Sequence, residues 1–213
     1  MKFLIFKFYF KKVYVYIIHI MNIFMKLLVL VGLIIVSPII VISIFLVLLE
    51  DGRPVIFMQK RLGKNKKEFT LYKIRTMYKS APNLGTHEVS SSHYLNFCSL
   101  LRKLKIDELP QLINYLKGEI NLIGPRPGMS SQIKLKEYRD IHKIFNVKPG
   151  ITGFAQILGY DMSDPEVLAK IDRLYIEKKS FKLDSKIFFG TFFKSIRSSL
   201  NLQYKYEIEQ IIK

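Results

Sequence analysis

Two adjacent carboxylates, Asp107 and Glu108, are the residues of this 213-residue chain whose types and spacing most favour chemistry. We expect them in the first turn of a helix, because apolar residues follow at i, i+3, i+4 and i+7: Leu109, Leu112, Ile113 and Leu116. Asp107 suits the N-cap of that helix, Pro110 suits its first turn, and Gly118 suits its C-terminal stop. Capping alone is the ordinary role of an isolated Asp-Glu pair at such a position.

Basic residues bracket this acidic pair. Arg102, Lys103 and Lys105 precede it, and Arg126 follows it within a Pro-Arg-Pro turn. A helix N-terminus favours anions, and cations bind phosphate directly. Two acids placed among bases therefore suit chemistry on a phosphorylated, metal-bound substrate.

Residues 51–77 predict a β-hairpin. Its first strand covers residues 55–59, its turn residues 63–66, and its second strand residues 69–76. Lys73 and Arg75 lie on one face of the second strand, so they project together, as a phosphate clamp requires. A solvated basic face is the alternative for this hairpin.

Residues 27–49 carry no charge and are long enough to cross a hydrocarbon core of about 30 Å. Ser37 and Pro38 stand at the centre, where proline removes a backbone donor and a serine hydroxyl can bond a freed carbonyl. Basic residues flank both ends, so the positive-inside rule gives no orientation to a single pass. These residues leave two structures open, a spanning helix and a re-entrant hairpin with both ends on one side.

The remaining segments give coarser predictions. Residues 1–22 mix Lys with aromatic residues, which suits the membrane interface, and Met21 and Met25 are alternative initiation sites. Residues 78–93 predict a polar loop that covers the site, and residues 130–147 predict a charged helix. Residues 165–200 predict two helices, and in the second an aromatic side suits either the core or the membrane interface: Phe188, Phe189, Phe192, Phe193 and Ile196.

Composition narrows the class of protein. The net charge of +17 requires an anionic partner: nucleic acid, a phosphorylated substrate or an acidic membrane surface. No nucleic-acid-binding module is recognisable. The single cysteine, Cys98, excludes an internal disulfide and lies in an apolar run typical of a core thiol. The four histidines show no metal-ligand spacing.

Several sequence blocks carry a family resemblance. They read Gly-x-Pro-Val-x-Phe-x-Gln-x-Arg-x-Gly, Lys-x-Arg-Thr-Met, Asp-Glu-Leu-Pro-Gln-Leu-Ile-Asn, Leu-Lys-Gly-Glu, Ile-Gly-Pro-Arg-Pro and Pro-Gly-Ile-Thr-Gly-aromatic-Ala-Gln. Together, over residues 23–197, the chain resembles the bacterial sugar transferases, the short form of the monotopic polyprenyl-phosphate phosphoglycosyl transferases. It departs from the family pattern at Phe154, where Trp is usual, and at Tyr160, where an Arg is usual. The Lys-Arg and Asp that usually begin the membrane helix are absent from residues 21–25.

The resemblance implies an activity. Such an enzyme transfers a sugar 1-phosphate from a UDP-sugar to polyprenyl (undecaprenyl) phosphate, releases UMP, and initiates the assembly of a membrane-linked glycan. Asp107 is then the nucleophile that carries a covalent phosphosugar, and Glu108 holds Mg²⁺. The expected phosphate-binding residues are Lys73, Arg75, Arg102, Arg126 and Lys148.

The resemblance also implies a fold and a location. We expect a mostly helical α+β protein with an N-terminal extension (1–22), a re-entrant membrane helix broken at Ser37 and Pro38 (23–50), a catalytic domain with a β-hairpin and interfacial amphipathic helices (51–200), and a tail (201–213). Both ends of the membrane helix then face the cytoplasm at the bacterial inner membrane, in contact with its lipids.

Three other functions are compatible with parts of the sequence. A glycosyltransferase that leaves the sugar-bearing phosphate behind would release UDP. A membrane-anchored basic adaptor would need no acidic pair, and a nucleic-acid binder would need no long apolar run. The motifs specify neither the sugar, the glycan nor the oligomeric state.

Overall fold

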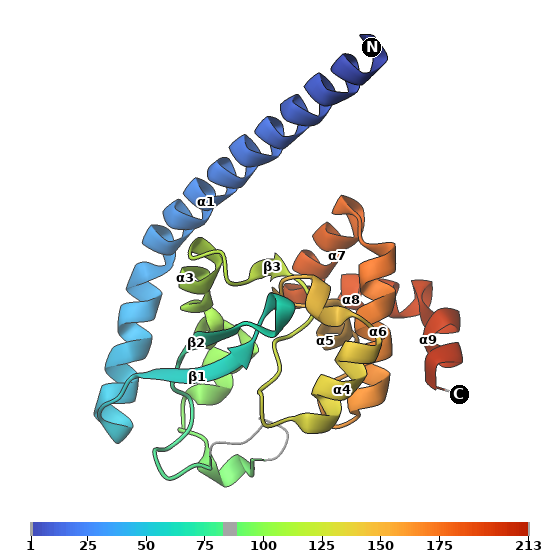
Figure 1. The fold of residues 1–213 in the computed structure, drawn as a ribbon. Coiled ribbons are helices and arrows are strands. Elements are labelled where there is room, and N and C mark those ends of the chain that lie inside the picture. The colour runs from blue at the N-terminus through green and yellow to red at the C-terminus, as the bar shows by residue number, and fades with distance from the viewer. Residues whose placement is uncertain (1, 83–88, 213) are drawn as a thin grey trace.

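The computed structural model describes residues 2–82 and 89–212. A long helix, α1 (Lys2–Asp51), lies along one side of a mostly helical domain that carries two small β-sheets, and its N-terminal part projects beyond that domain (Figure 1). The mostly helical α+β class is therefore confirmed.

Helix α1 contains the uncharged segment. Its stretch Ile20–Asp51 is long and apolar enough to cross a membrane, and its most apolar 18-residue window has a mean hydropathy of 3.1 and is only 6% buried. Pro38 lies inside the helix, and the Ser37 hydroxyl donates to the Ile34 carbonyl at 2.7 Å. Figure 1 shows that α1 bends along its light-blue part. The expected break is therefore a bend within one continuous helix, since serine bonds a carbonyl near the proline. Its membrane topology stays a prediction.

The predicted hairpin is confirmed. Strands β1 (Ile56–Leu62) and β2 (Glu68–Ile74) pair antiparallel across the short turn η1 (Lys64–Lys66). β1 is longer than predicted, because Lys60, Arg61 and Leu62 also pair with β2.

A second, parallel sheet joins the Pro-Arg-Pro and Pro-Gly-Ile-Thr-Gly blocks through β3 (Asn121–Ile123) and β4 (Gly150–Thr152). The Gly124 N–H donates to the Thr152 carbonyl at 3.0 Å, and the Gly150 N–H donates to the Pro125 carbonyl at 3.0 Å. A Cβ atom on Gly150 would lie 2.1 Å from the Gly124 nitrogen. Only glycine permits this close approach of two backbones.

The main core lies among the C-terminal helices, which follow α4 (Ile133–Ile141), η5 (Ile144–Asn146) and α5 (Phe154–Leu158). These helices are α6 (Pro165–Lys178), α7 (Phe181–Phe192), α8 (Lys194–Gln203) and α9 (Lys205–Ile212). The two-helix prediction for residues 165–200 was wrong, because the extended backbone of Phe193 separates α7 from α8. Residues 201–212 complete α8 and form α9, and Tyr204 between the two helices and Ile208 of α9 are buried in this core.

A smaller core attaches α1 to the hairpin and to α2 (Cys98–Lys103). Val47 of α1 packs with Ile74, Leu95 and Cys98, so the predicted buried thiol is confirmed. Burial raises the pKa of that thiol. The predicted polar loop 78–93 includes residues 83–88, which lie outside the described residues. Beside them are a β-bridge between Met77 and Tyr94 and the short turn η3 (Ser91–His93).

Candidate active site

The acidic pair lies in a short 3₁₀ turn, η4 (Ile106–Glu108), before helix α3 (Gln111–Leu116). The N-cap prediction for Asp107 was wrong, because α3 begins only after Pro110 and no side chain caps it. Lys105, just before the turn, has left-handed backbone with φ +59°. Such a conformation is costly for a residue with a side chain, and here it turns the chain directly into the acidic pair.

Helix α3 buries its polar side. Its buried residues are Gln111 and Asn114, while Leu112 and Leu116 are half-buried and Ile113 is exposed. In the segment before it, Asp107, Glu108 and Pro110 are buried and Leu109 is half-buried. Asn114 is fully buried and bonded, since its amide donates to the Thr70 carbonyl at 2.7 Å and accepts from the Tyr72 N–H at 3.2 Å. Helix α3 also contacts α1, so its half-buried and exposed apolar side chains are free to pack there. This packing turns the side chains of Asp107 and Glu108 toward the interior. Gly118, with φ +78°, follows the end of α3 as predicted.

The acids line a cavity of about 640 Å³ between the hairpin, α2, η4 and α5. Among the residues that the structure describes, seven cations line it with them: Arg61, Lys73, Arg75, Lys79, Arg102, Lys105 and Arg126. Its wall is completed by Gln59, Gln156, Tyr160, Asp161 and Asp172 among others. Phosphorylated molecules suit a cavity with this excess of positive charge.

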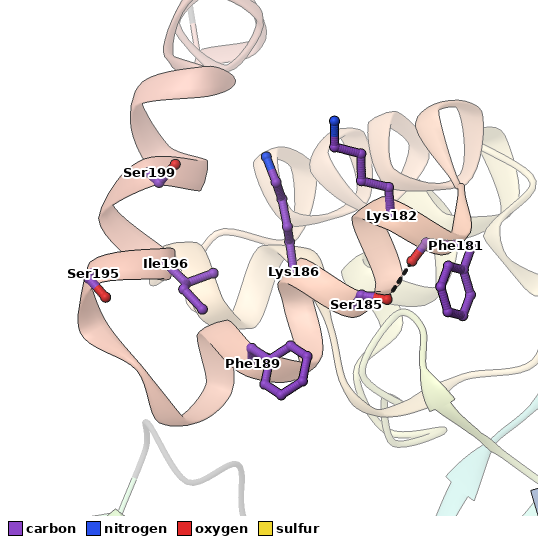
Figure 2. A pocket seen from close by; sticks show the side chains of 8 residues that line it. All are labelled: Phe181, Lys182, Ser185, Lys186, Phe189, Ser195, Ile196 and Ser199. Carbon is purple, nitrogen blue, oxygen red and sulfur yellow. Dashed lines mark hydrogen bonds between the residues drawn. The ribbon is translucent and has the colours of Figure 1, made fainter.

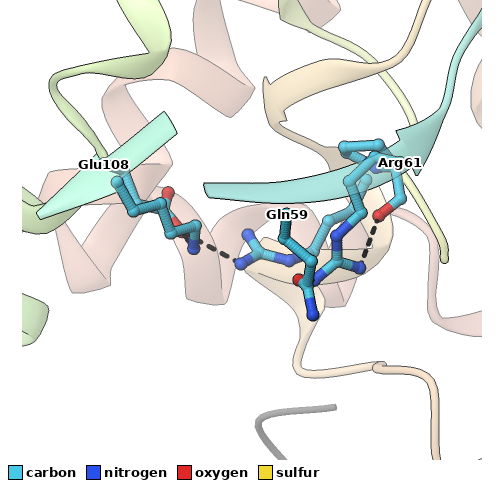
Figure 3. Close-up of polar contacts among 6 residues, drawn as sticks. Gln59, Arg61 and Glu108 are labelled. Atoms are coloured by element: carbon cyan, nitrogen blue, oxygen red, sulfur yellow. Dashed lines mark hydrogen bonds and ion pairs between the residues drawn. The ribbon is translucent and has the colours of Figure 1, made fainter. Parts of the chain in front are cut away.

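Glu108 is fixed by two cations. Its Oε1 accepts from Lys73 Nζ at 2.8 Å and from an Arg126 nitrogen at 3.0 Å, and its side chain is 6% exposed. Burial disfavours the Glu108 charge, yet Lys73 and Arg126 outweigh that effect and hold the pKa of Glu108 well below its ordinary value. Glu108 is therefore ionised throughout the physiological range. Figure 3 shows Glu108 with its bonded partners, on the other side of the close-up from Arg61.

Asp107 has the opposite environment. Its side chain is 7% exposed, and the buried Oδ1 has no hydrogen-bond partner. Burial raises the pKa of Asp107, and the negative charge of Glu108 adds to this effect, although Lys73 opposes it. An ionised carboxylate without bonds to stabilise its charge is a stronger base and nucleophile than a bonded one.

Four of the five predicted phosphate ligands line this cavity: Lys73, Arg75, Arg102 and Arg126. Lys73 and Arg126 hold Glu108, and Arg102 lines the cavity with its guanidinium 4.5 Å from the centre of the Tyr94 ring. Arg75 also lines the cavity and bonds Asp51 at the end of α1, and its role with Lys73 in phosphate binding stays a prediction. Lys148 is not among the lining residues of this cavity. Its ammonium lies beside Gly118, 3.6 Å from the place of a Cβ atom there.

Gln59, Arg61 and Gln156 are among the polar residues of the cavity that sequence reasoning missed. Gln156, with its amide oxygen turned toward them, accepts from Lys105 Nζ at 3.2 Å and from Arg126 at 3.0 Å. Arg61 donates to the Pro127 carbonyl at 3.1 Å and to Gln59, which Figure 3 shows beside it. Burial and the nearby Arg126 and Arg139 lower the pKa of Arg61 to about 10. The Gln-x-Arg and Ala-Gln pairs in the family blocks were the signals available.

The donor set also fits magnesium. Among residues 2–82 and 89–212, no group of three or more His, Cys, Asp or Glu could hold a metal ion. Mg²⁺, however, is commonly bound by one or two carboxylates together with substrate phosphates. Both cations bind Oε1 of Glu108, so Oε2 is the oxygen that suits a metal ion.

An acidic pair in a cationic cavity, attached to a long apolar helix, defines an enzyme with an anion-binding active site and a candidate membrane segment. The family model for bacterial sugar transferases matches residues 15–198. This chain therefore belongs to the bacterial sugar transferase family, and the resemblance read from its motifs is confirmed.

Curated relatives support this assignment. The uncharacterized sugar transferase EpsL of Bacillus subtilis (strain 168) is 42% identical over 151 residues, which are 71% of this chain and 74% of that protein. The UDP-N-acetylgalactosamine-undecaprenyl-phosphate N-acetylgalactosaminephosphotransferase of Aeromonas hydrophila is 36% identical over 167 residues, 73% of this chain but 38% of that protein. The undecaprenyl-phosphate glucose phosphotransferase of Komagataeibacter xylinus is 34% identical over 185 residues, 78% of this chain and 34% of that protein.

Proposed function

We propose that this protein transfers a sugar 1-phosphate from a UDP-sugar to polyprenyl (undecaprenyl) phosphate, releasing UMP and starting a membrane-linked glycan. The observation that carries the proposal is the division of roles between two adjacent acids. Glu108 is neutralised by Lys73 and Arg126, whereas Asp107 keeps a buried oxygen free of hydrogen bonds in the same cationic cavity. The names of the Aeromonas and Komagataeibacter relatives supply the acceptor class.

The reaction proceeds in two displacements at phosphorus. Asp107 attacks the phosphate that bears the sugar, a carboxylate–phosphorus bond forms, and the bond to the UMP oxygen breaks. A phosphate oxygen of the acceptor then attacks the same phosphorus, forms the lipid diphosphate sugar and frees Asp107. Because a carboxylate is a weak nucleophile, positioning and charge neutralisation supply most of the acceleration.

The cavity residues support both displacements. Arg126 and Lys105, joined through Gln156, are available for the diphosphate oxygens, as is Arg102. Lys73 keeps Glu108 ionised and in place. Mg²⁺, held by Glu108, would neutralise charge on the diphosphate when bound.

The product of the first displacement tests this function. Purified protein is incubated with each of several UDP-sugars without acceptor. We expect one of them to release UMP up to one equivalent of enzyme, and to continue turning over when undecaprenyl phosphate is added. Release of UDP instead would mean a glycosyltransferase, and no nucleotide release with any UDP-sugar would favour a binding protein.

We further propose that α1 and the aromatic end of α7 contact the membrane. Four aromatic side chains of this end are 44–57% exposed, Phe188, Phe189, Phe192 and Phe193, while α7 buries Leu183 and Ile187. Figure 2 shows the groove between α7 and α8, where Phe189 and Ile196 lie toward one end and Lys182 and Lys186 extend away from them. Aromatic residues at acyl depth with lysines at headgroup depth are typical of interfacial helices.

The bend at Pro38 leads to a topology prediction. We expect residues 20 and 52 to face the cytoplasm together, because both flanks of the apolar segment are basic. A membrane-impermeant thiol reagent added to intact cells should miss cysteines introduced as Ile20→Cys or Arg53→Cys, and should label both after lysis. Labelling of one end in intact cells would establish a spanning helix.

Pro38→Ala is the matched test of the bend. Restoring the backbone donor should straighten α1 and make the Ile20→Cys site partly accessible from outside. Ile39→Ala changes the neighbouring residue without altering backbone bonding, so this control should leave the labelling pattern unchanged.

Tyr160 gives a second prediction. It lines the cavity where the family usually carries an arginine. Tyr160→Arg should add one charge-assisted contact to substrate phosphate, worth roughly 1.5–3 kcal/mol, and lower the KM for the UDP-sugar. Initial rates of UMP formation against UDP-sugar concentration measure this. Tyr160→Phe should leave KM near wild type, and an unchanged or raised KM in Tyr160→Arg would place this position away from the phosphates.

A further inference from the structure

The C-terminal end of α1 is held to the catalytic domain by a polar group of residues, the helix-end cluster: Glu50, Asp51, Arg75, Tyr78 and Asn96. Arg75 donates to Asp51 Oδ2 at 2.6 Å and to the backbone carbonyls of Asp51 and Gly52 at 3.2 and 2.6 Å. Its side chain is 6% exposed and that of Asp51 is 21% exposed. The pair is therefore largely removed from solvent.

The second acid makes a parallel set of bonds. Glu50 Oε1 accepts from the Tyr78 hydroxyl at 3.0 Å and from the Asn96 N–H at 2.7 Å, and Asp51 Oδ2 also accepts from the Lys79 N–H at 3.0 Å. These donors come from two chain segments, 75–79 and 96. The last turn of α1 thus ties both segments together.

Both acids stand at the unfavourable end of the helix dipole. A carboxylate at a helix C-terminus is destabilising, and α1 has no basic residue in its last turn. Arg75 supplies the missing positive charge and satisfies carbonyls that the end of a helix leaves unbonded. Glu50 and Asp51 therefore do not stabilise the helix through its dipole. Their partners all belong to the domain.

The segment bound by the cluster is also a wall of the active-site cavity. The cavity is lined by Arg75, Thr76, Met77, Tyr78 and Lys79, and Lys73, which lies two residues before Arg75 in β2, bonds Glu108. The cluster consequently connects α1 and this cavity wall directly.

We propose that the helix-end cluster is a positioning device that fixes the cavity relative to the membrane helix, so that the cavity meets a phosphate carried by a membrane lipid. This inference rests on the proposed function. A donor UDP-sugar binds from the aqueous phase, so its binding does not depend on the depth of the cavity relative to the bilayer. An acceptor anchored in the bilayer presents its phosphate at one depth, so its apparent affinity falls with the fraction of molecules that hold the cavity at that depth.

The test compares two acceptors and two half-reactions in the full-length protein in lipid nanodiscs. Asp51→Asn and Glu50→Ala should each raise the apparent KM for undecaprenyl phosphate in the bilayer by roughly tenfold, as expected for lost charge-assisted bonds. The KM for a short, water-soluble prenyl phosphate should stay within about twofold of wild type, as should the acceptor-free burst of UMP. Asp51→Glu, which keeps the carboxylate, should recover part of the loss.

Asp140→Asn is the matched control. It removes one acid from an exposed pair with Lys66, at 45% exposure for each side chain, and neither residue is among those that line the cavity. It should leave both KM values unchanged. Melting temperatures of all variants in the same nanodiscs report folding, and Glu50→Ala keeps the test valid where Asp51→Asn does not fold.

Two outcomes would overturn the inference while leaving the proposed function intact. One is an equal rise in KM for the bilayer and soluble acceptors, which would make the cluster a purely structural feature. The other is no rise for either acceptor in folded variants. Failure of the proposed function is distinguishable, because wild-type protein would then release no UMP from any UDP-sugar.

Discussion

Asp107→Asn should abolish turnover at every magnesium concentration. The substitution preserves shape but removes the charge of the attacking oxygen, so no phosphosugar intermediate can form. Loss of a nucleophile typically leaves a residual rate of roughly 10⁻⁴ or less. Steady-state UMP formation measures the loss. Mass spectrometry of wild-type protein, incubated with UDP-sugar alone and digested, should find the added phosphosugar on the peptide that contains Asp107.

Misfolding is excluded as a cause of this loss by the structure around Asp107. Its Oδ1 makes no hydrogen bond, so Asn breaks no bond at that atom and also removes a buried charge. The melting temperature of Asp107→Asn should therefore equal or exceed that of wild type. Retained turnover in this variant would sink the nucleophile assignment. A phosphosugar found on Glu108 would instead exchange the roles of the two acids.

Glu108→Gln should reduce turnover by roughly 10²–10³-fold through a different physical effect, the loss of charge in a preorganised site. Lys73 and Arg126 then lose their shared anionic partner, and the magnesium ion that we propose at Glu108 would lose its carboxylate. Because the nucleophile remains, raising the magnesium concentration should restore part of the activity. Titration of magnesium against the initial rate of UMP release measures the recovery.

Lys73→Met provides the comparison for this variant. It removes one cation from Glu108 but leaves Arg126 bonded at 3.0 Å and both carboxylates in place. Its activity should fall without any recovery from added magnesium. Recovery in Lys73→Met equal to that in Glu108→Gln would show that the metal effect is unrelated to Glu108.

Local patterns were sufficient for the elements that depend on near neighbours in the chain. The alternating strand pattern around Lys73 gave the hairpin, and Gly118 gave the end of α3, because both features arise from backbone preferences over a few residues. The apolar segment around Pro38 predicted a helix over residues 23–50, and the structure extends that helix to Lys2–Asp51. The position of the acidic pair within η4 was not predictable, since Pro110 and the left-handed Lys105 shift the start of α3 past it.

Side-chain partners distant in sequence required the folded chain. The strand pattern predicted one face for Lys73 and Arg75, yet Lys73 of β2 bonds Glu108 and Arg75, just after β2, bonds Asp51. The alternation of side chains along a strand predicts a common face for the two residues. It does not predict their ion-pair partners, because these depend on where α1 and η4 pack against the hairpin. The position of Lys148 also depends on the folded chain, because its ammonium lies beside Gly118 and does not line the cavity.

The sequence by itself determined that this chain has an apolar membrane-type helix, a basic hairpin and an Asp-Glu pair in the order typical of bacterial sugar transferases. Only the tertiary structure decided which of the two acids is neutralised and which keeps an unbonded oxygen. Glu108 meets Lys73 from 35 residues away and Arg126 from 18 residues away, whereas Asp107 Oδ1 meets no donor. The ionisation and reactivity of a carboxylate depend on burial and on charges within a few ångströms. Adjacent residues of similar type therefore acquire different chemistry only once the chain is folded.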